Sequence, residues 1–295
     1  MNNAQPSILL PPTRSGRFLT LNLVHEAVAA EACARLETLK LEGTLIVGLG
    51  DPLVRAVGGG TIAGLRPFPA VSGPGGAFPS TQGAVWLFIG GDDPGEILHR
   101  SRRLLAHLGD AFRVDEDVAS FVYGEGRDLS GFEDGTENPK EARAIEVALA
   151  LGAAGLAGGS FVATQRWLHD LTHFERLAQR DRNFIIGRDL ETNEELADAP
   201  PSAHVKRAAQ ESFDPAAFML RRSMPWGDVR EHGLYFVAYA ATLDPFERVL
   251  RRMAGLEDGV TDALLRFTRP LSGGYYWCPP VSANRLDLRA LRASS

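Results

Sequence analysis

The chain has 295 residues, which is enough for one large domain or two of ordinary size. Apolar residues make up 44% of it and charged residues 23%, so we expect a globular fold. The net charge of −6 argues against nucleic acid as the main partner, because phosphate contacts need a basic face. No apolar run spans a bilayer and segment 1–16 does not resemble a secretory signal, so we expect a cytoplasmic protein without a membrane partner.

The first half of the chain predicts the element order β-α-β-β-α-β. Segment 1–16 contains three prolines, which oppose helix and central strand, so we expect a tail or an arm there. Hydrophobic periodicity then predicts a strand at 17–24, a helix at 26–40, strands at 44–48 and 84–89, a helix at 93–108 and a strand at 111–123. This order is the ferredoxin-like unit, in which helices cover one face of an antiparallel sheet.

A similar order returns after residue 139. The patterns predict a strand at 160–167, a helix at 170–178, a strand pair at 218–223 and 234–241, a helix at 245–254 and a last strand at 273–277. The state of the apolar segment 184–187 stays open, and the polar segment 191–205 is expected to be a flexible connection. We therefore predict an α+β fold of two ferredoxin-like domains, residues 1–124 and 125–295. No repeat is visible at the level of residues, so the duplication is an inference about architecture.

Residues 127–139 form the most informative stretch. Asn138-Pro139 marks a chain break, and Gly131 and Gly135 allow sharp turns around the acidic residues between them. On composition alone, an acidic surface turn explains this stretch.

The same residues carry a family resemblance. The pattern Gly131-Phe132-x-Asp134-Gly135-Thr136-x-Asn138-Pro139 resembles the signature of the dye-decolourising peroxidases, and Asp128 to Phe132 resembles their bacterial, cytoplasmic branch. The resemblance implies a fold of two ferredoxin-like halves. It also implies one haem b per chain in the C-terminal half.

A haem protein of this kind needs an axial histidine. Ser202-Ala203-His204-Val205-Lys206-Arg207 is similar to the family segment that supplies it, so His204 is expected to bind the iron and Arg207 to contact the cofactor. Asp262 matches the acid that accepts the second N–H of the ligand; a surface acid at a helix start is the alternative. His169 and His173 have zinc-compatible spacing, but no third ligand is evident, and we take both as structural.

The resemblance also implies which residues lie on the distal side of the haem, opposite the axial histidine. Segment 220–227 is similar to the one that carries the distal arginine, which makes Arg221 the candidate, with Arg222 as the rival if the strand register differs. Ser223 stands where some relatives carry Asn, which weakens any role for a side-chain amide. Phe236 is expected to form an apolar wall, and Asp134 to act as the acid–base group.

These parts predict a peroxidase that reduces hydrogen peroxide and oxidises dyes, phenols or other bulky donors, with its optimum at acidic pH. Electrons are expected to pass through surface aromatic residues, with Tyr275, Tyr276 and Trp277 as candidates, although core packing explains them equally well. Two rivals remain. One is a haem-handling protein that releases iron and leaves the porphyrin intact, and the other is a haem-free binding module.

Three further expectations concern the rest of the chain. Cys33 and Cys278 are expected to be idle thiols, since no zinc-type spacing exists. Spaced leucines in 285–292 favour a terminal packing segment over a tail that docks in a protein nanocompartment. We also expect a homo-oligomer.

Overall fold

The computed structural model describes residues 3–58, 61–152 and 155–292. Its strands are β1 (Ser15–Leu23), β2 (Thr44–Gly50), β3 (Val71–Gly73), β4 (Gly76–Phe78), β5 (Val85–Gly91), β6 (Phe112–Phe121), β7 (Ser160–His169), β8 (Leu220–Arg221), β9 (Met224–Gly227), β10 (His232–Ala240), β11 (Thr268–Pro270), β12 (Gly274–Cys278), β13 (Val281–Ser282) and β14 (Arg285–Leu286). Its α-helices are α1 (Ala29–Thr38), α2 (Asp51–Val57), α3 (Pro94–Leu108), α4 (Glu141–Ala148), α5 (Leu171–Arg176), α6 (Gln179–Ile186), α7 (His204–Arg207) and α8 (Asp244–Met253).

The main sheet closes into an antiparallel barrel. The N-terminal half contributes strands in the order β2-β5-β1-β6 and the C-terminal half in the order β12-β7-β10-β9, each the order of a ferredoxin-like unit. The halves meet twice, where β12 pairs with β2 and where β6 pairs with β9. The predicted α+β class with two ferredoxin-like units is confirmed, and the two units share one continuous sheet.

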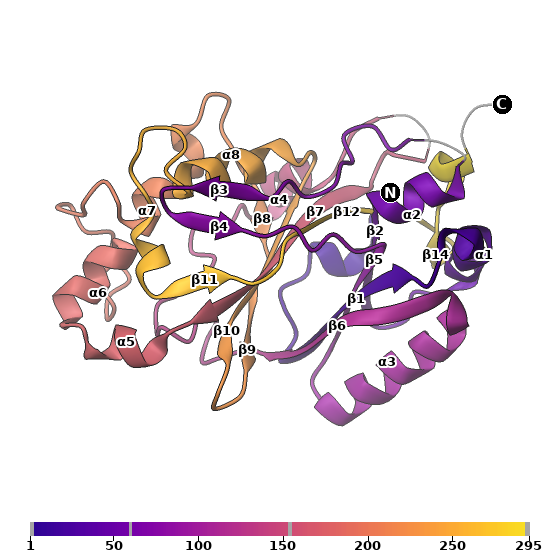
Figure 1. Ribbon diagram of the computed structural model, residues 1–295, viewed down its shortest axis with the longest axis horizontal. Helices are drawn as coiled ribbons and strands as arrows, with labels where there is room; N and C mark the ends of the chain where they lie inside the picture. The colour runs from indigo at the N-terminus through magenta and orange to yellow at the C-terminus, as the bar shows by residue number, and fades with distance from the viewer. Residues whose placement is uncertain (1–2, 59–60, 153–154, 293–295) are drawn as a thin grey trace.

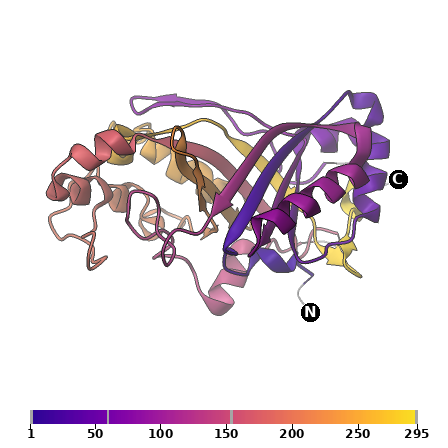
Figure 2. The same ribbon diagram turned by 90° about the horizontal axis from the view of Figure 1, so that it is seen from below.

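Side chains alternate between the interior of the barrel and its helix-covered outer face. Phe18 and Trp86 belong to a cluster drawn from all eight barrel strands, in which Tyr235 stacks on Phe18 with ring centroids 4.0 Å apart. Leu19 and Leu87 belong to the outer cluster, together with the apolar faces of the helices. Helices α1, α2 and α3 lie at one end of the molecule and α5 to α8 at the other (Figures 1 and 2).

The N-terminal segment is part of the core, contrary to the expected tail. Gln5 is fully buried, and its side-chain amide exchanges two hydrogen bonds with the backbone of Val47 in β2 and donates a third to the carbonyl of Pro279. Ile8, in the single 3₁₀ turn Pro6–Ile8, is also fully buried. Apart from this 3₁₀ turn, residues 3–14 form no helix or strand, but one amide side chain gives the segment the hydrogen bonds of a strand neighbour.

Sequence periodicity missed several short elements. Helices α2 and α4 and the β3–β4 hairpin were not predicted, and the unassigned segment 184–187 is the end of α6. The predicted cap of α3 is confirmed, since the Asp93 carboxylate accepts a hydrogen bond from the Glu96 amide. Cys33 and Cys278 are both free and buried. Within the described ranges, no helix has the length and apolarity needed to cross a membrane.

The leucines of the C-terminal segment pack inward. Leu286, Leu288 and Leu291 are all buried in the outer cluster. Residues 293–295 lie outside the described part of the chain.

We predict that Gln5→Ala lowers the free energy of unfolding by about 2–4 kcal/mol, because it leaves buried backbone groups of Val47 and Pro279 without partners. Urea unfolding followed by circular dichroism measures the change. Gln179→Ala is the matched control, because this glutamine is exposed and the substitution should cost less than about 0.5 kcal/mol. Equal midpoints for the two variants would show that the N-terminal segment is not part of the cooperative fold.

Candidate active site

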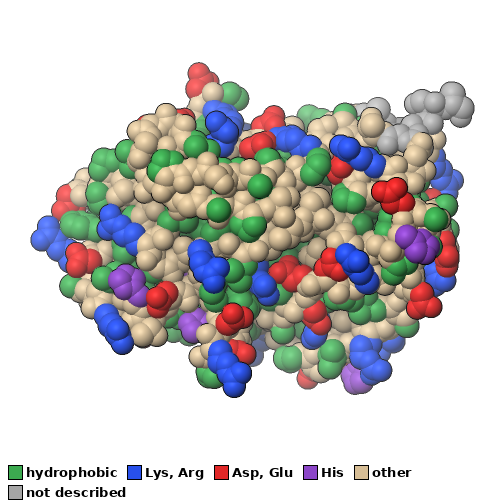
Figure 3. All heavy atoms as spheres, in the orientation of Figure 1, with side chains coloured by type: hydrophobic (Ala, Val, Ile, Leu, Met, Phe, Trp, Pro, Cys, Tyr) green, Lys and Arg blue, Asp and Glu red, His purple; other side chains and the backbone are tan. Residues whose placement is uncertain are grey.

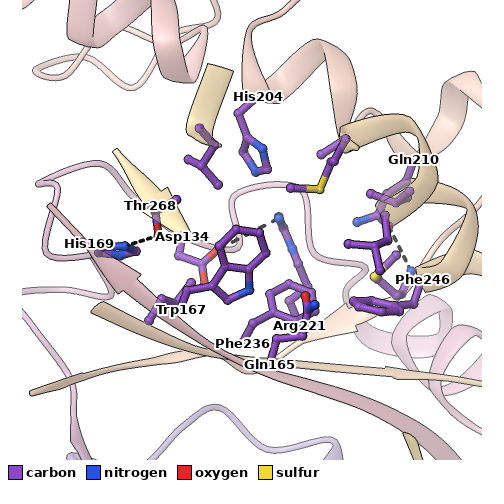
Figure 4. A pocket seen from close by; sticks show the side chains of 17 residues that line it. Asp134, Gln165, Trp167, His169, His204, Gln210, Arg221, Phe236, Phe246 and Thr268 are labelled. Atoms are coloured by element: carbon purple, nitrogen blue, oxygen red, sulfur yellow. Dashed lines mark hydrogen bonds and ion pairs between the residues drawn. The ribbon is translucent and has the colours of Figure 1, made fainter. Parts of the chain in front are cut away.

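A cavity lies between the outer face of the C-terminal strands and the helices around α8 (Figure 4). Its wall is largely apolar, with a few polar groups that point inward. The lining residues are Asp134, Gln165, Trp167, His169, His204, Ala208, Gln210, Met219, Arg221, Leu234, Phe236, Phe246, Val249, Leu250, Met253, Leu264 and Thr268.

His204 lines one side of this cavity, at the first residue of α7. Its Nδ1 donates to Oδ2 of Asp262 at 2.8 Å, and Oδ1 of Asp262 accepts from the Leu264 amide. Asp262 is 1% exposed, so this hydrogen bond fixes both the ring orientation and the tautomer. The lone pair of Nε2 is therefore left for a ligand, and a carboxylate behind a histidine is the usual support of a metal-binding imidazole. The structure thus brings together the two residues that the sequence predicted as a pair.

The acidic loop folds as a series of tight turns that place Asp134 at the cavity. Gly131 and Gly135 have φ of +91° and +76°, values that side-chain-bearing residues rarely adopt. Phe132 is buried against Phe174 of α5 and anchors the loop. An acidic surface turn therefore does not fully describe this stretch, because Phe132 is buried in the core and Asp134 lines the cavity.

Arg221 lies beside Asp134, with Nη1 4.0 Å from Oδ1. The side-chain amide of Asn138 holds the two segments together, since it accepts from the Arg221 amide and donates to the Arg221 carbonyl. Arg222 points away from the cavity, toward the carbonyls of Leu9 and Leu10. The register is thus the one favoured from the sequence, and Figure 4 shows Arg221, Gln165 and Phe236 reaching into the cavity from the side opposite His204.

His169 ties the acidic loop to β7. Its Nε2 donates to Oδ1 of Asp128 at 3.0 Å, and its Nδ1 lies 2.6 Å from the hydroxyl oxygen of Thr268. Burial alone would raise the pKa of Asp128, but the hydrogen bond and charge of His169, with the hydrogen bonds from Ser130, lower it below its usual value. His169 is therefore structural, as predicted. Within the described residues, no group of three or more His, Cys, Asp or Glu could hold a metal ion.

Several expected site residues lie elsewhere. Arg207 is turned away from the cavity and makes a two-pronged ion pair with Asp258 at 2.7 and 2.8 Å, so it supports α7 and does not line the site. Ser223 is not part of the lining, and its hydroxyl accepts from the Val237 amide. Tyr275, Tyr276 and Trp277 are at most 1% exposed, so the core-packing alternative holds and none of them is a surface aromatic.

Other residues at the site carried no predicted role. Gln165, Trp167, Gln210 and Met219 line the cavity, but they resemble ordinary strand and loop residues in sequence. Asn138 belongs to the quoted motif, and only the structure reveals that its side chain bonds β8.

The cavity has the donors and the surface that a large apolar ligand with a metal centre needs. Among the described residues, Nε2 of Gln165 and Nε of Arg221 are buried without a hydrogen-bond partner, and both residues line it. Buried polar atoms of this kind normally find a partner, so they point to a group that occupies the space. Together with Nε2 of His204 and walls of Phe, Leu and Met, they fit a haem.

The fold and the site define an α+β barrel protein with a histidine-bearing cofactor cavity on its outer face. Residues 125–283 match the family model described as Dyp-type peroxidase, C-terminal. The Dye-decolorizing peroxidase of Mycobacterium tuberculosis is 31% identical over 93% of this chain and 88% of its own length. The chain belongs to the Dyp-type peroxidase family.

Other similarities extend this result. A Rhodococcus jostii RHA1 DypB variant solved in complex with heme superposes with a TM-score of 0.87 at 29% identity, over the whole of both chains. A Deferrochelatase of Yersinia pestis is 24% identical over 69% of this chain and 55% of its own length.

We predict that Asp128→Ala costs about 2–4 kcal/mol of stability at pH 7, because it leaves Nε2 of His169 and the Ser130 amide without their acceptor. A carboxylate with a lowered pKa stabilises the fold fully above its unfolded value of about 4 and loses this effect as the pH falls through the folded value. The difference from wild type should therefore shrink below about pH 4.

Urea midpoints at pH 7 and pH 3 measure the effect. Asp198→Asn, at an exposed carboxylate, is the control and should change neither midpoint. A difference between Asp128→Ala and wild type that grows in acid would contradict the assignment.

Proposed function

We propose that the protein is a peroxidase that holds one haem b per chain, reduces hydrogen peroxide and oxidises dyes, phenols or other bulky electron donors. One arrangement carries the proposal: an imidazole backed by a buried carboxylate faces a carboxylate–guanidinium pair across an apolar cavity. His204 would hold the iron through Nε2, and Asp262 would orient the imidazole of His204. Phe236 would cover part of the porphyrin. Asp134 and Arg221 would stand on the peroxide side.

When bound, the haem supplies the redox-active iron at which the peroxide bond is broken. Asp134 takes the proton from one peroxide oxygen and delivers it to the other, so that the oxygen–oxygen bond breaks heterolytically and water leaves. Arg221 supplies fixed positive charge next to the oxygen that becomes negative. Two donor molecules then each give one electron and one proton, so that H₂O₂ and two AH become two H₂O and two A radicals.

The axial role of His204 is tested by the visible spectrum of protein produced with haem supply. The wild-type protein should show a Soret band that shifts when peroxide is added. His204→Ala should lose most of the band or retain a haem with a changed spectrum, because the ligand from the chain is gone. His173→Ala removes an exposed histidine on α5 and should leave the spectrum unchanged. A His204→Ala protein with the wild-type spectrum and turnover would refute the assignment.

The two neighbouring arginines provide a matched pair for the peroxide step. Arg221→Leu should slow the spectral change after peroxide addition by about a hundredfold or more, the usual effect of losing one charge-stabilising donor. Arg222→Leu should leave this rate within a few-fold of wild type, since its guanidinium faces the N-terminal segment. Stopped-flow absorbance measures both rates, and equal effects would contradict the roles.

Release of iron from haem is the second candidate, favoured by the similarity to a Deferrochelatase. Chromatography of the pigment after incubation separates the two functions. Free protoporphyrin would support iron release, whereas intact haem and oxidised donor support the peroxidase.

The remaining expectations stay predictions. We propose that residue 124 ends the first domain, that the chain forms a homo-oligomer in the cytoplasm, and that it does not dock in a nanocompartment. The inward packing of Leu286, Leu288 and Leu291 supports the last point, because these side chains are already used within the chain.

A further inference from the structure

An open groove lies behind one wall of the active-site cavity. It is surrounded by the end of β7 with the following Asp170, the start of α5, β11 and the β9–β10 hairpin. His169 and Thr268 line both this groove and the active-site cavity. The two spaces are therefore separated by a wall one side chain thick.

The groove has a cationic rim. Arg230, Arg266 and Arg269 line it and are exposed, and within the described ranges their guanidinium groups form no hydrogen bond or ion pair. His232 adds a further nitrogen base, with Nδ1 3.1 Å from the Asp228 carbonyl. The lining includes one carboxylate, Asp170, which caps α5. Figure 3 shows Lys or Arg side chains on this face over β11 and at the hairpin.

The other side of the active-site cavity offers an anion no unpaired arginine among its lining residues. There the cavity continues into a hollow lined by five carboxylates (Glu133, Asp134, Glu137, Glu195 and Glu211) and two arginines, Arg188 and Arg221. Four of these carboxylates form ion pairs: Glu133 with Arg127, Asp134 with Arg221, Glu137 with Arg188 and Glu195 with Lys206. Both lining arginines are thus already paired with carboxylates, so this hollow suits a neutral molecule such as hydrogen peroxide better than an anion.

Unpaired cations matter more in a chain whose net charge is −6. An anion approaching most of this surface is repelled, so a local positive groove concentrates and orients it. Three arginines also present planar donors that match the oxygens of a sulfonate or carboxylate. The groove also includes the apolar residues Leu265 and Phe267, which can contact the aromatic ring of such a ligand.

We propose that this groove, with Arg230, Arg266 and Arg269, binds anionic aromatic electron donors, such as sulfonated or carboxylated phenols, against the His169 wall of the active site. The inference rests on the proposed peroxidase function and names the donor class that this face selects. The donor phenol gives up one electron and its phenolic proton and becomes a phenoxyl radical. Two donors are consumed for each hydrogen peroxide, which becomes two water molecules.

The test uses the haem-loaded protein and the variant Arg230→Gln/Arg266→Gln/Arg269→Gln. Its control, Arg14→Gln/Arg102→Gln/Arg251→Gln, removes the same number of charges from exposed arginines outside the groove. Calorimetric titration without peroxide measures binding of naphthalene-2-sulfonate and of the neutral naphthalene-2-sulfonamide. Steady-state kinetics compares guaiacolsulfonate with neutral guaiacol.

The groove variant should lose about tenfold in affinity for the sulfonate and in kcat/KM for guaiacolsulfonate, the sum of three modest exposed ion pairs. Sulfonamide binding, guaiacol turnover and the spectral response to peroxide should stay within about twofold, and the control variant should behave as wild type. Equal losses for charged and neutral compounds, equal losses in the control, or no loss would each overturn the proposal.

The same measurements separate the two inferences. If guaiacol is oxidised but sulfonate binding ignores the three arginines, the groove assignment fails and the peroxidase stands. If no donor is oxidised while sulfonate binding depends on the arginines, the peroxidase fails and the groove stands.

Discussion

Strand β7 has hydrogen-bonded neighbours along both edges, β10 on one side and β12 followed by β11 on the other. This pairing on both edges closes the barrel and fixes the register of β7. Because residues along a strand alternate in direction, a fixed register places Gln165, Trp167 and His169 together on the outer face. The register of this strand therefore decides three things. It places Gln165 and Trp167 in the cavity, it brings His169 to Asp128 of the acidic loop, and it places His169 between the cavity and the groove.

The active site is assembled from segments that only the closed sheet brings together. Asp134 comes from the loop after β6, Arg221 from β8, and His204 from a short helix that Asp262 supports from beyond α8. None of these residues is close to another in sequence. His204 is held by the buried Asp262 carboxylate, and the backbone of Arg221 is held by Asn138. The fold itself thus positions these groups, and pre-organised polar groups are the main source of electrostatic catalysis.

Much of this was accessible from the sequence, for identifiable reasons. The long strands and α3 follow from periodicity and from the Asp93 cap, and the repeat of one strand order predicted the two units. The His204–Asp262 pair and Asp134 came from motif resemblance, and strand alternation favoured Arg221 over Arg222. What the sequence could not reveal depends on contacts between distant residues: the burial of Gln5, the diversion of Arg207 to Asp258, and the joining of two units in one sheet. Sequence left open whether Tyr275, Tyr276 and Trp277 are core or surface residues, because both kinds of aromatic residue look the same in sequence; the structure places all three in the core.

The amide of Asn138 gives Arg221 the two hydrogen bonds that an adjacent strand would give it. The loop that carries Asp134 is therefore fixed to the backbone of β8 four residues after the acid. Lys140, the one residue between Pro139 and α4, lies beyond this attachment, so an insertion there would leave the hydrogen bonds between Asn138 and Arg221 in place. In an engineering programme, that connection is the place where new sequence can be introduced next to the active site while its geometry is preserved.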